Sequence, residues 1–275
     1  MMRNLRFMAA LLIVAACMVV VSGCLDNSPG TGQGLNKQDG TGDGQRLNSQ
    51  NGSGGGFDGG QHIQNGSGYA GGQGGFKDSE YVTAFNPSGF KQSTDVYPVG
   101  NLTEAEAADI LFMAEEEKLA RDAYLYYYDK WGQPVFSNIA SAEETHMDSM
   151  VVLIERYGLV NPVGGEERGV FENPELQALY DDLVKSGSVS ETDALKNGAL
   201  IEEIDIIDLN DAIAGTDKQD IILIYDNLKR GSENHLRSFV SNLERRGVSY
   251  SPQELSEDEY DLIMQGDIDR GQRTL

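Results

Sequence analysis

Apolar residues recur every three or four positions along most of the chain from Asn101 onward. This spacing places them on one face of an α-helix and predicts amphipathic helices. We find no convincing alternation of apolar and polar residues of the kind that marks a half-buried strand, so we expect an all-α fold. The pattern predicts four long helices, over about 103–131, 136–157, 190–214 and 216–246. Two shorter helices are expected, one over 173–187 and one after Ser251 or Ser256.

Capping residues mark most of these helix ends. Thr103 and Glu106 form a capping box, in which each side chain bonds the backbone N–H of the other residue. A second box, Thr216 with Gln219, is expected to begin the fourth long helix. The other expected N-caps are Asn173 and Ser190, and the expected stops are Gly132 with Pro134, Gly158, Gly187 and Gly247.

The lengths of the connections suggest a topology. Short turns join the first long helix to the second and the third to the fourth, so each pair should be antiparallel. The connection over 159–189 is long enough to cross the whole assembly. Two antiparallel helix pairs joined by one long crossover describe a ferritin-like four-helix bundle.

Acidic and imidazole groups interrupt the apolar stripe near the middle of each long helix. Glu117 falls on the first stripe, and a carboxylate there is costly unless it is paired or bound to metal. Glu143 and His146 are three residues apart and face the same way, as in the Glu-x-x-His device of metal-binding bundles. The candidate metal ligands are Glu117, Glu143, His146, Glu202, Glu203 and His235, with Glu202 or Glu203 facing inward.

This ligand set is close to a di-iron carboxylate site, and its oxygen and imidazole donors suit iron or manganese. It departs from that pattern at Ser232, which stands where a carboxylate should precede His235 by three positions. Asp205 is the best substitute and Glu203 the next. We therefore expect either a dinuclear site or one that is mononuclear or asymmetric. Each residue taken singly could instead be a buried polar group satisfied by hydrogen bonds.

The run from Glu117 to Tyr124 resembles the first-helix pattern of rubrerythrin, in which Glu is followed by Ala-Arg and then Tyr. That resemblance implies that Glu117 is a metal ligand and that Tyr124 lies beside the site. Tyr124, Tyr127 or Tyr128 could relay electrons, although an aromatic cluster is more often plain core.

Five segments resemble the ferritin-like family known as domain of unknown function 2202, and together they extend from about Leu102 to Met264. The segments are 115–128, 138–157, 171–180, 201–209 and 231–237. The resemblance implies a ferritin-like fold for the folded part of the chain and carries no activity with it.

The N-terminus reads as a lipoprotein signal. Arg3 and Arg6 precede a continuous apolar run that ends in Val21-Ser22-Gly23-Cys24, which resembles a lipobox. We expect residues 1–23 to be a signal peptide and Cys24 to carry the lipid. Residues 24–100 are expected to form a flexible linker rich in Gly, Asn and Gln, with an irregular arm over 76–98. The helical domain is then 101–265, and 266–275 form a tail.

The net charge and the cysteine content limit which classes of partner and metal are expected. The 275 residues carry a formal net charge of −23, which argues against nucleic acid or an anionic lipid surface. Membrane contact is expected through the lipid on Cys24. After cleavage that cysteine is the only one left, so no internal disulfide can form and no thiolate remains for a soft metal site. The oligomeric state stays open, with a homodimer as one option.

Two functions follow from these features. One is an exported, lipid-anchored iron protein that acts on oxygen, peroxide or Fe(II); as an enzyme it would be a di-iron oxidoreductase such as a ferroxidase or peroxidase. The other is a binding or structural module of the cell envelope that keeps the bundle without catalysis. A fold alone does not choose between them.

Overall fold

The structure is a computed structural model that describes residues 87–165 and 167–266, and all secondary structure in these ranges is helical. The four long helices are α3 (Glu104–Trp131), α4 (Pro134–Tyr157), α6 (Glu191–Ala214) and α7 (Gln219–Glu244). The short helices are α2 (Pro87–Thr94), α5 (Pro174–Gly187) and α8 (Glu257–Gln265). The expected signal peptide, Cys24, most of the linker and the tail from 267 on lie outside the described residues.

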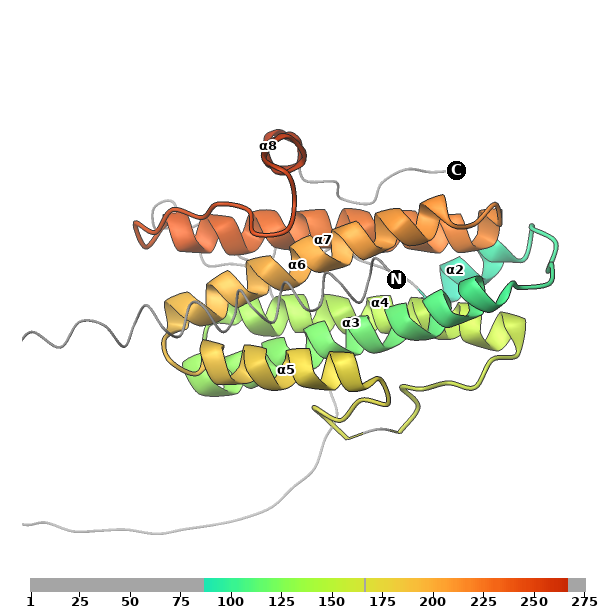
Figure 1. Cartoon of the computed structure of the whole chain (residues 1–275), viewed down its shortest axis with the longest axis horizontal. Coiled ribbons are helices and arrows are strands. Elements are labelled where there is room, and N and C mark those ends of the chain that lie inside the picture. The colour runs from blue at the N-terminus through green and yellow to red at the C-terminus, as the bar shows by residue number, and fades with distance from the viewer. Residues whose placement is uncertain (1–86, 166, 267–275) are drawn as a thin grey trace, which may run out of the picture. The chain divides into compact units, whose positions relative to one another are not determined.

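The long helices lie side by side, and the most extensive contacts join α3 to α4 and α6 to α7 (Figure 1). The chain leaves α4 at one end of this group and runs back along it through α5 to the start of α6 at the other end. Helix α5 packs on α3 and α6. The short turns and the single long connection expected from the sequence are therefore present.

Local capping explains most helix ends. Thr103 and Glu106 form the expected capping box at α3, and Gly132 ends that helix with a positive φ of 67°. Asn173 and Ser190 cap α5 and α6 through their side chains, and Ser256 begins α8 with a further capping box.

Two local expectations were wrong, and one helix boundary differs. Helix α3 ends at Trp131, before Gly132 and Pro134, as expected, but α4 begins at Pro134 and not at about 136, because the missing N–H of Pro134 costs nothing in the first turn. The Thr216 box does not form: helix α7 is capped at Lys218 without a side-chain hydrogen bond. The arm over 76–98 is not wholly irregular, because α2 forms there and packs on α4 and α7.

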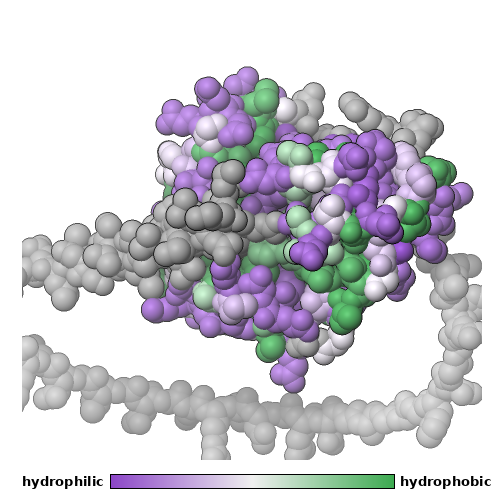
Figure 2. Space-filling model, turned by 45° about the vertical axis from the view of Figure 1, so that its right-hand side comes forward, coloured by the Kyte–Doolittle hydropathy of each residue, from purple (hydrophilic) through white to green (hydrophobic). Residues whose placement is uncertain are grey.

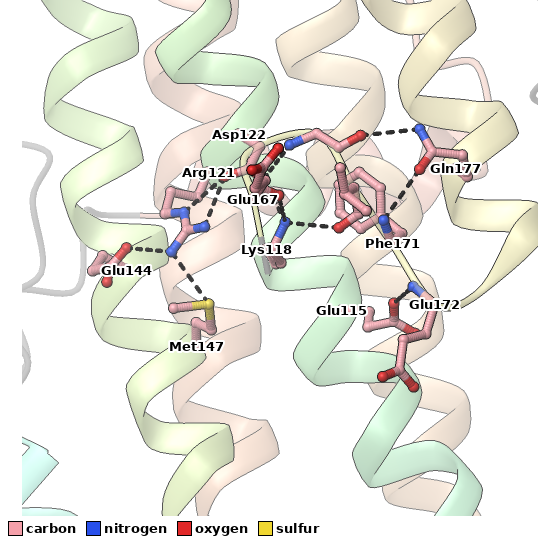
Figure 3. Close-up of polar contacts among 12 residues, drawn as sticks. Glu115, Lys118, Arg121, Asp122, Glu144, Met147, Glu167, Phe171, Glu172 and Gln177 are labelled. Carbon is pink, nitrogen blue, oxygen red and sulfur yellow. Dashed lines mark hydrogen bonds and ion pairs between the residues drawn. The ribbon is translucent and has the colours of Figure 1, made fainter. Parts of the chain in front are cut away.

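Helix α3 is buried on nearly all sides, including Lys118 and Asp122. The ammonium group of Lys118 donates to Asp122 Oδ2 at 2.8 Å and to the carbonyls of Glu167 and Val170 at 3.0 Å (Figure 3). The N–H of Gly169 donates to the same Asp122 oxygen at 2.8 Å. These contacts fasten the connection between α4 and α5 onto one side of α3, while other sides of α3 pack on α4 and α6.

Hydrophilic side chains predominate on the face of the molecule shown in Figure 2, with hydrophobic residues scattered among them. Among the described residues, no helix combines the length and the apolar character that crossing a bilayer requires.

The first prediction concerns Glu106, which receives hydrogen bonds from Lys218 and Thr216. Burial alone would raise the pKa of Glu106, but these donors and Thr103 outweigh it and lower the pKa from 4.5 to about 2. The stabilisation is therefore complete above pH 4.5 and is lost as the pH falls towards 2.

Replacing Glu106 by Gln should lower the free energy of unfolding at pH 7 by about 1–2 kcal/mol, less than the full shift implies because the pair lies near the surface. The difference from wild type should shrink between pH 5 and pH 3, as measured by urea denaturation. Glu104→Gln, at an exposed position in the same turn, is the control. If the variant lost the same free energy of unfolding at every pH, the lowered pKa of Glu106 would not be the source of the stabilisation.

The second prediction concerns Asp122. Asp122→Asn should lower the free energy of unfolding by about 3–5 kcal/mol, because it leaves the Lys118 ammonium buried without its counter-charge. Asp129→Asn is the matched control, since Asp129 pairs with Arg168 of the same connection but on the surface. That change should cost less than about 1 kcal/mol. Both changes are measured by urea denaturation. Equal losses in the free energy of unfolding would show that the burial of Asp122 does not make its ion pair more important than the surface pair.

Candidate metal centre

Each of the four long helices contributes a charged or imidazole side chain to one buried cluster. The members are Glu117 from α3, Glu143 and His146 from α4, Glu202 from α6, and His235 from α7, each at most 1% exposed. All five were expected from the sequence, and the structure brings them together between the helices.

Glu143 lies at the centre of this cluster. Its Oε2 is 2.8 Å from His146 Nδ1, and its Oε1 is 2.8 Å from His235 Nδ1. The two imidazole rings stack with their centroids 5.4 Å apart and their planes at 28°. One carboxylate therefore joins the two histidines, as a bridging ligand joins two halves of a site.

Two further carboxylates extend the cluster, one beside each histidine. Glu117 Oε2 lies 3.3 Å from His146 Nδ1, and Glu202 Oε2 lies 3.5 Å from His235 Nδ1. The phenol of Tyr124 donates to Glu202 Oε1 at 2.5 Å and fixes the direction of that carboxylate. The five ligand-type residues thus form two similar halves, each with one His and one outer Glu, on either side of Glu143.

The pKa values of the cluster residues are shifted because three carboxylates and two imidazoles are buried together. Burial raises the pKa of Glu117 and of Glu202, each to about 7. Burial acts in the same direction on Glu143, but His235 and His146 outweigh it and lower its pKa. Burial lowers the pKa of His235, yet Glu143 and Glu202 outweigh it and raise that pKa to about 9. The excess of carboxylates stabilises positive charge inside the cluster, either on protonated imidazoles or on a cation that replaces their protons.

Unpaired atoms support a fit to metal. Within the described part of the chain, Glu117 Oε1, Glu143 Oε1 and both ring nitrogens of His235 have no hydrogen-bond partner. Glu143 Oε1 and His235 Nδ1 approach each other without the alignment of a hydrogen bond. One ligand atom from each of Glu143, His146 and His235 lies within 4.8 Å of the others. Two ligands about 2.1 Å from one small ion lie at most about 4.2 Å apart, so any separation near the upper limit would have to shorten when an ion binds.

Glu203 is the one predicted ligand that the structure places elsewhere. Its Oε1 accepts from the Tyr250 hydroxyl at 2.6 Å, and its Oε2 accepts from three backbone N–H groups at 2.8–2.9 Å. These donors belong to Gln253, Glu254 and Leu255. A step of one residue turns a side chain by about 100° around a helix, so Glu202 and Glu203 cannot both face inward. Glu203 holds the connection between α7 and α8 instead.

The three tyrosines suggested as electron relays lie in different surroundings. Only Tyr124 contacts the cluster, whereas Tyr127 donates to the carbonyl of Leu183 and Tyr128 is 40% exposed. Of the residues suggested as electron relays, Tyr124 alone has the contact that the role requires.

Gly231 is a site residue that the sequence did not reveal. A Cβ at this position would collide with the imidazole of His146, so the ring packs directly on the backbone of α7. A glycine in the middle of a long helix, one residue before Ser232, was the available signal.

The similarity to known proteins covers the part of the chain that contains the four long helices and the cluster. The family described as "Uncharacterized protein domain (DUF2202)" matches residues 106–267. Uncharacterized protein MJ0754 of Methanocaldococcus jannaschii is 47% identical over 174 residues, which cover 63% of this chain and 94% of that protein. The crystal structure of hypothetical protein MJ0754 from Methanococcus jannaschii matches with a TM-score of 0.61 and 46% identity, over 62% of this chain and 98% of the other. The chain therefore belongs to the DUF2202 family.

Proposed function

We propose that this protein is a ferritin-like metalloprotein whose buried cluster binds iron for redox chemistry. The observation that carries the proposal is the position of Glu143, which contacts a histidine from each of two helices with its two oxygens. Four long helices with one long crossover, and an inward Glu-x-x-His pair, support a ferritin-like bundle.

Iron suits the donors. The cluster offers carboxylate oxygen and imidazole nitrogen, and manganese is the alternative that the same donors accept. When bound, iron would supply one-electron chemistry, so that two Fe(II) giving one electron each would reduce one hydrogen peroxide, with two protons, to two waters. Oxygen or Fe(II) itself are the other candidate substrates.

The residues of the chain would divide the work. Glu143 would join the two halves of the site, with Glu117 and His146 on one side and Glu202 and His235 on the other. The hydrogen bond from Tyr124 would hold Glu202 in position, as outer partners of ligating carboxylates commonly do. The buried surroundings would exclude bulk water from the cluster.

The alternative function is a structural or binding module of the cell envelope. Its support is that each histidine already contacts two carboxylates, so that the cluster could satisfy itself as a buried charge network without metal. Metal content separates the two functions.

The third prediction is that the full-length protein, purified without a metal-binding tag, takes up about two equivalents of Fe(II) in an anaerobic titration followed by absorbance. Changing Glu143 and His146 to Ala should abolish that uptake. Glu144→Ala is the matched control, because Glu144 is the neighbouring residue but points outward to Arg121. If wild type binds no metal and added Fe(II) leaves its melting temperature unchanged, the structural module is the better description.

We also propose that the protein is exported and held at the membrane by a lipid on Cys24, as the lipobox-like sequence indicates. The fourth prediction follows: Cys24→Ser should move the protein from the membrane fraction to the soluble or unprocessed fraction. Serine has nearly the same size but no thiol to receive the lipid. Membrane association that persists in this variant would point to another anchor.

A further inference from the structure

The two histidine-bearing helices of the cluster are not equivalent. On α4, Glu143 precedes His146 by three residues, and both face the cluster. On α7, the residue three before His235 is Ser232, which is 1% exposed. A hydroxyl brings no negative charge, so α7 lacks the carboxylate that would match Glu143 on the other side of the site.

A carboxylate from the neighbouring helix α6 contacts Ser232, at the position where α7 lacks an acid. Asp205 on α6 is 5% exposed, and its Oδ2 accepts a hydrogen bond from the hydroxyl of Ser232. The same hydroxyl also contacts the carbonyl of Leu228 at 3.0 Å. Asp205 follows Glu202 by three positions, so both side chains lie on one face of α6.

Three observations place Asp205 at the cluster. Its carboxylate interacts electrostatically with Glu117, with the neighbouring Glu116 and with Glu202, and Glu117 and Glu202 belong to different halves of the site. Its partner Ser232 is next to Gly231, whose backbone supports the ring of His146. Asp205 Oδ1 has no hydrogen-bond partner within the described residues. A buried carboxylate oxygen without a hydrogen-bond partner, close to other buried carboxylates, is a suitable ligand atom for a cation.

We propose that Asp205 supplies the carboxylate that α7 lacks, held in place by Ser232, and that this completes a second metal-ion site in the cluster. The inference deepens the proposed function and rests on it. With Asp205, four buried carboxylates face the site, and their charge balances two divalent cations. With only Glu117, Glu143 and Glu202, a second divalent ion would leave an uncompensated positive charge in the core, which is costly.

The fifth prediction tests this assignment by anaerobic calorimetric titration of the full-length protein with Fe(II). Asp205→Asn keeps the shape of the side chain and removes its charge, so uptake should fall from about two equivalents to about one. Asp211→Asn is the control, an acid-to-amide change on the same helix at an exposed position. It should retain both equivalents.

Two further variants guard against a simple folding defect. Ser232→Ala keeps every charge and should bind both ions, with the weaker one bound about 10-fold less tightly because Asp205 loses its positioning partner. Ser232→Glu in the Asp205→Asn background restores Glu-x-x-His on α7 and should recover the second equivalent. Such a recovery is not expected of a variant that is merely misfolded.

The outcomes separate this inference from the function on which it rests. If Asp205→Asn binds Fe(II) with the stoichiometry and affinity of wild type, Asp205 is not a ligand, while the loss of uptake on changing Glu143 and His146 still supports the metal site. If wild type takes up no Fe(II), the metal site itself is rejected, and the Asp205 assignment falls with it.

Discussion

The contact of one carboxylate with two histidines is the interaction on which the centre of this molecule depends. Glu143 can meet His146 on its own helix and His235 on α7 only if α4 and α7 lie close together and in one register. The stacked rings and the glycine beside His146 require the same close approach. Three carboxylates and two imidazoles buried together would be unstable without mutual compensation, so the packing and the charge distribution of the core constrain each other.

Helix α3 shows how the fold keeps two charged regions apart. Glu117 points to the cluster, whereas the next residue, Lys118, points to the connection between α4 and α5 and is neutralised there by Asp122. Adjacent residues on a helix differ by about 100° in direction, so consecutive charges serve different neighbours. The Lys118 network fixes the long connection onto a different side of α3 from the one that carries Glu117 (Figure 3).

The cluster combines near-symmetry with one clear break. Each half has a histidine and an outer glutamate, and Glu143 joins them. Ser232 and Asp205 replace the carboxylate that symmetry would place on α7. A shorter acid carried on the neighbouring helix occupies a different position from a Glu on α7, so the two halves of the site have different surroundings. Two ions bound there would experience different ligand fields, which is a physical basis for unequal affinities.

The sequence by itself determined the features that depend on interactions between residues close together in the chain. The period of the apolar residues predicted the long helices, and caps such as Thr103 and Asn173 predicted their ends, because these bonds form between residues close in the chain. Glu143 and His146 were also found, since a spacing of three fixes their common face, and Glu117 and His235 were found because they fall on apolar stripes. What the sequence left open was decided by partners distant in the chain. Thr216 donates to Glu106 and does not cap α7, and Glu203 is drawn to residues 250–255 while Glu202 faces His235. Those choices depend on the rotation and register of packed helices, which only the tertiary structure sets.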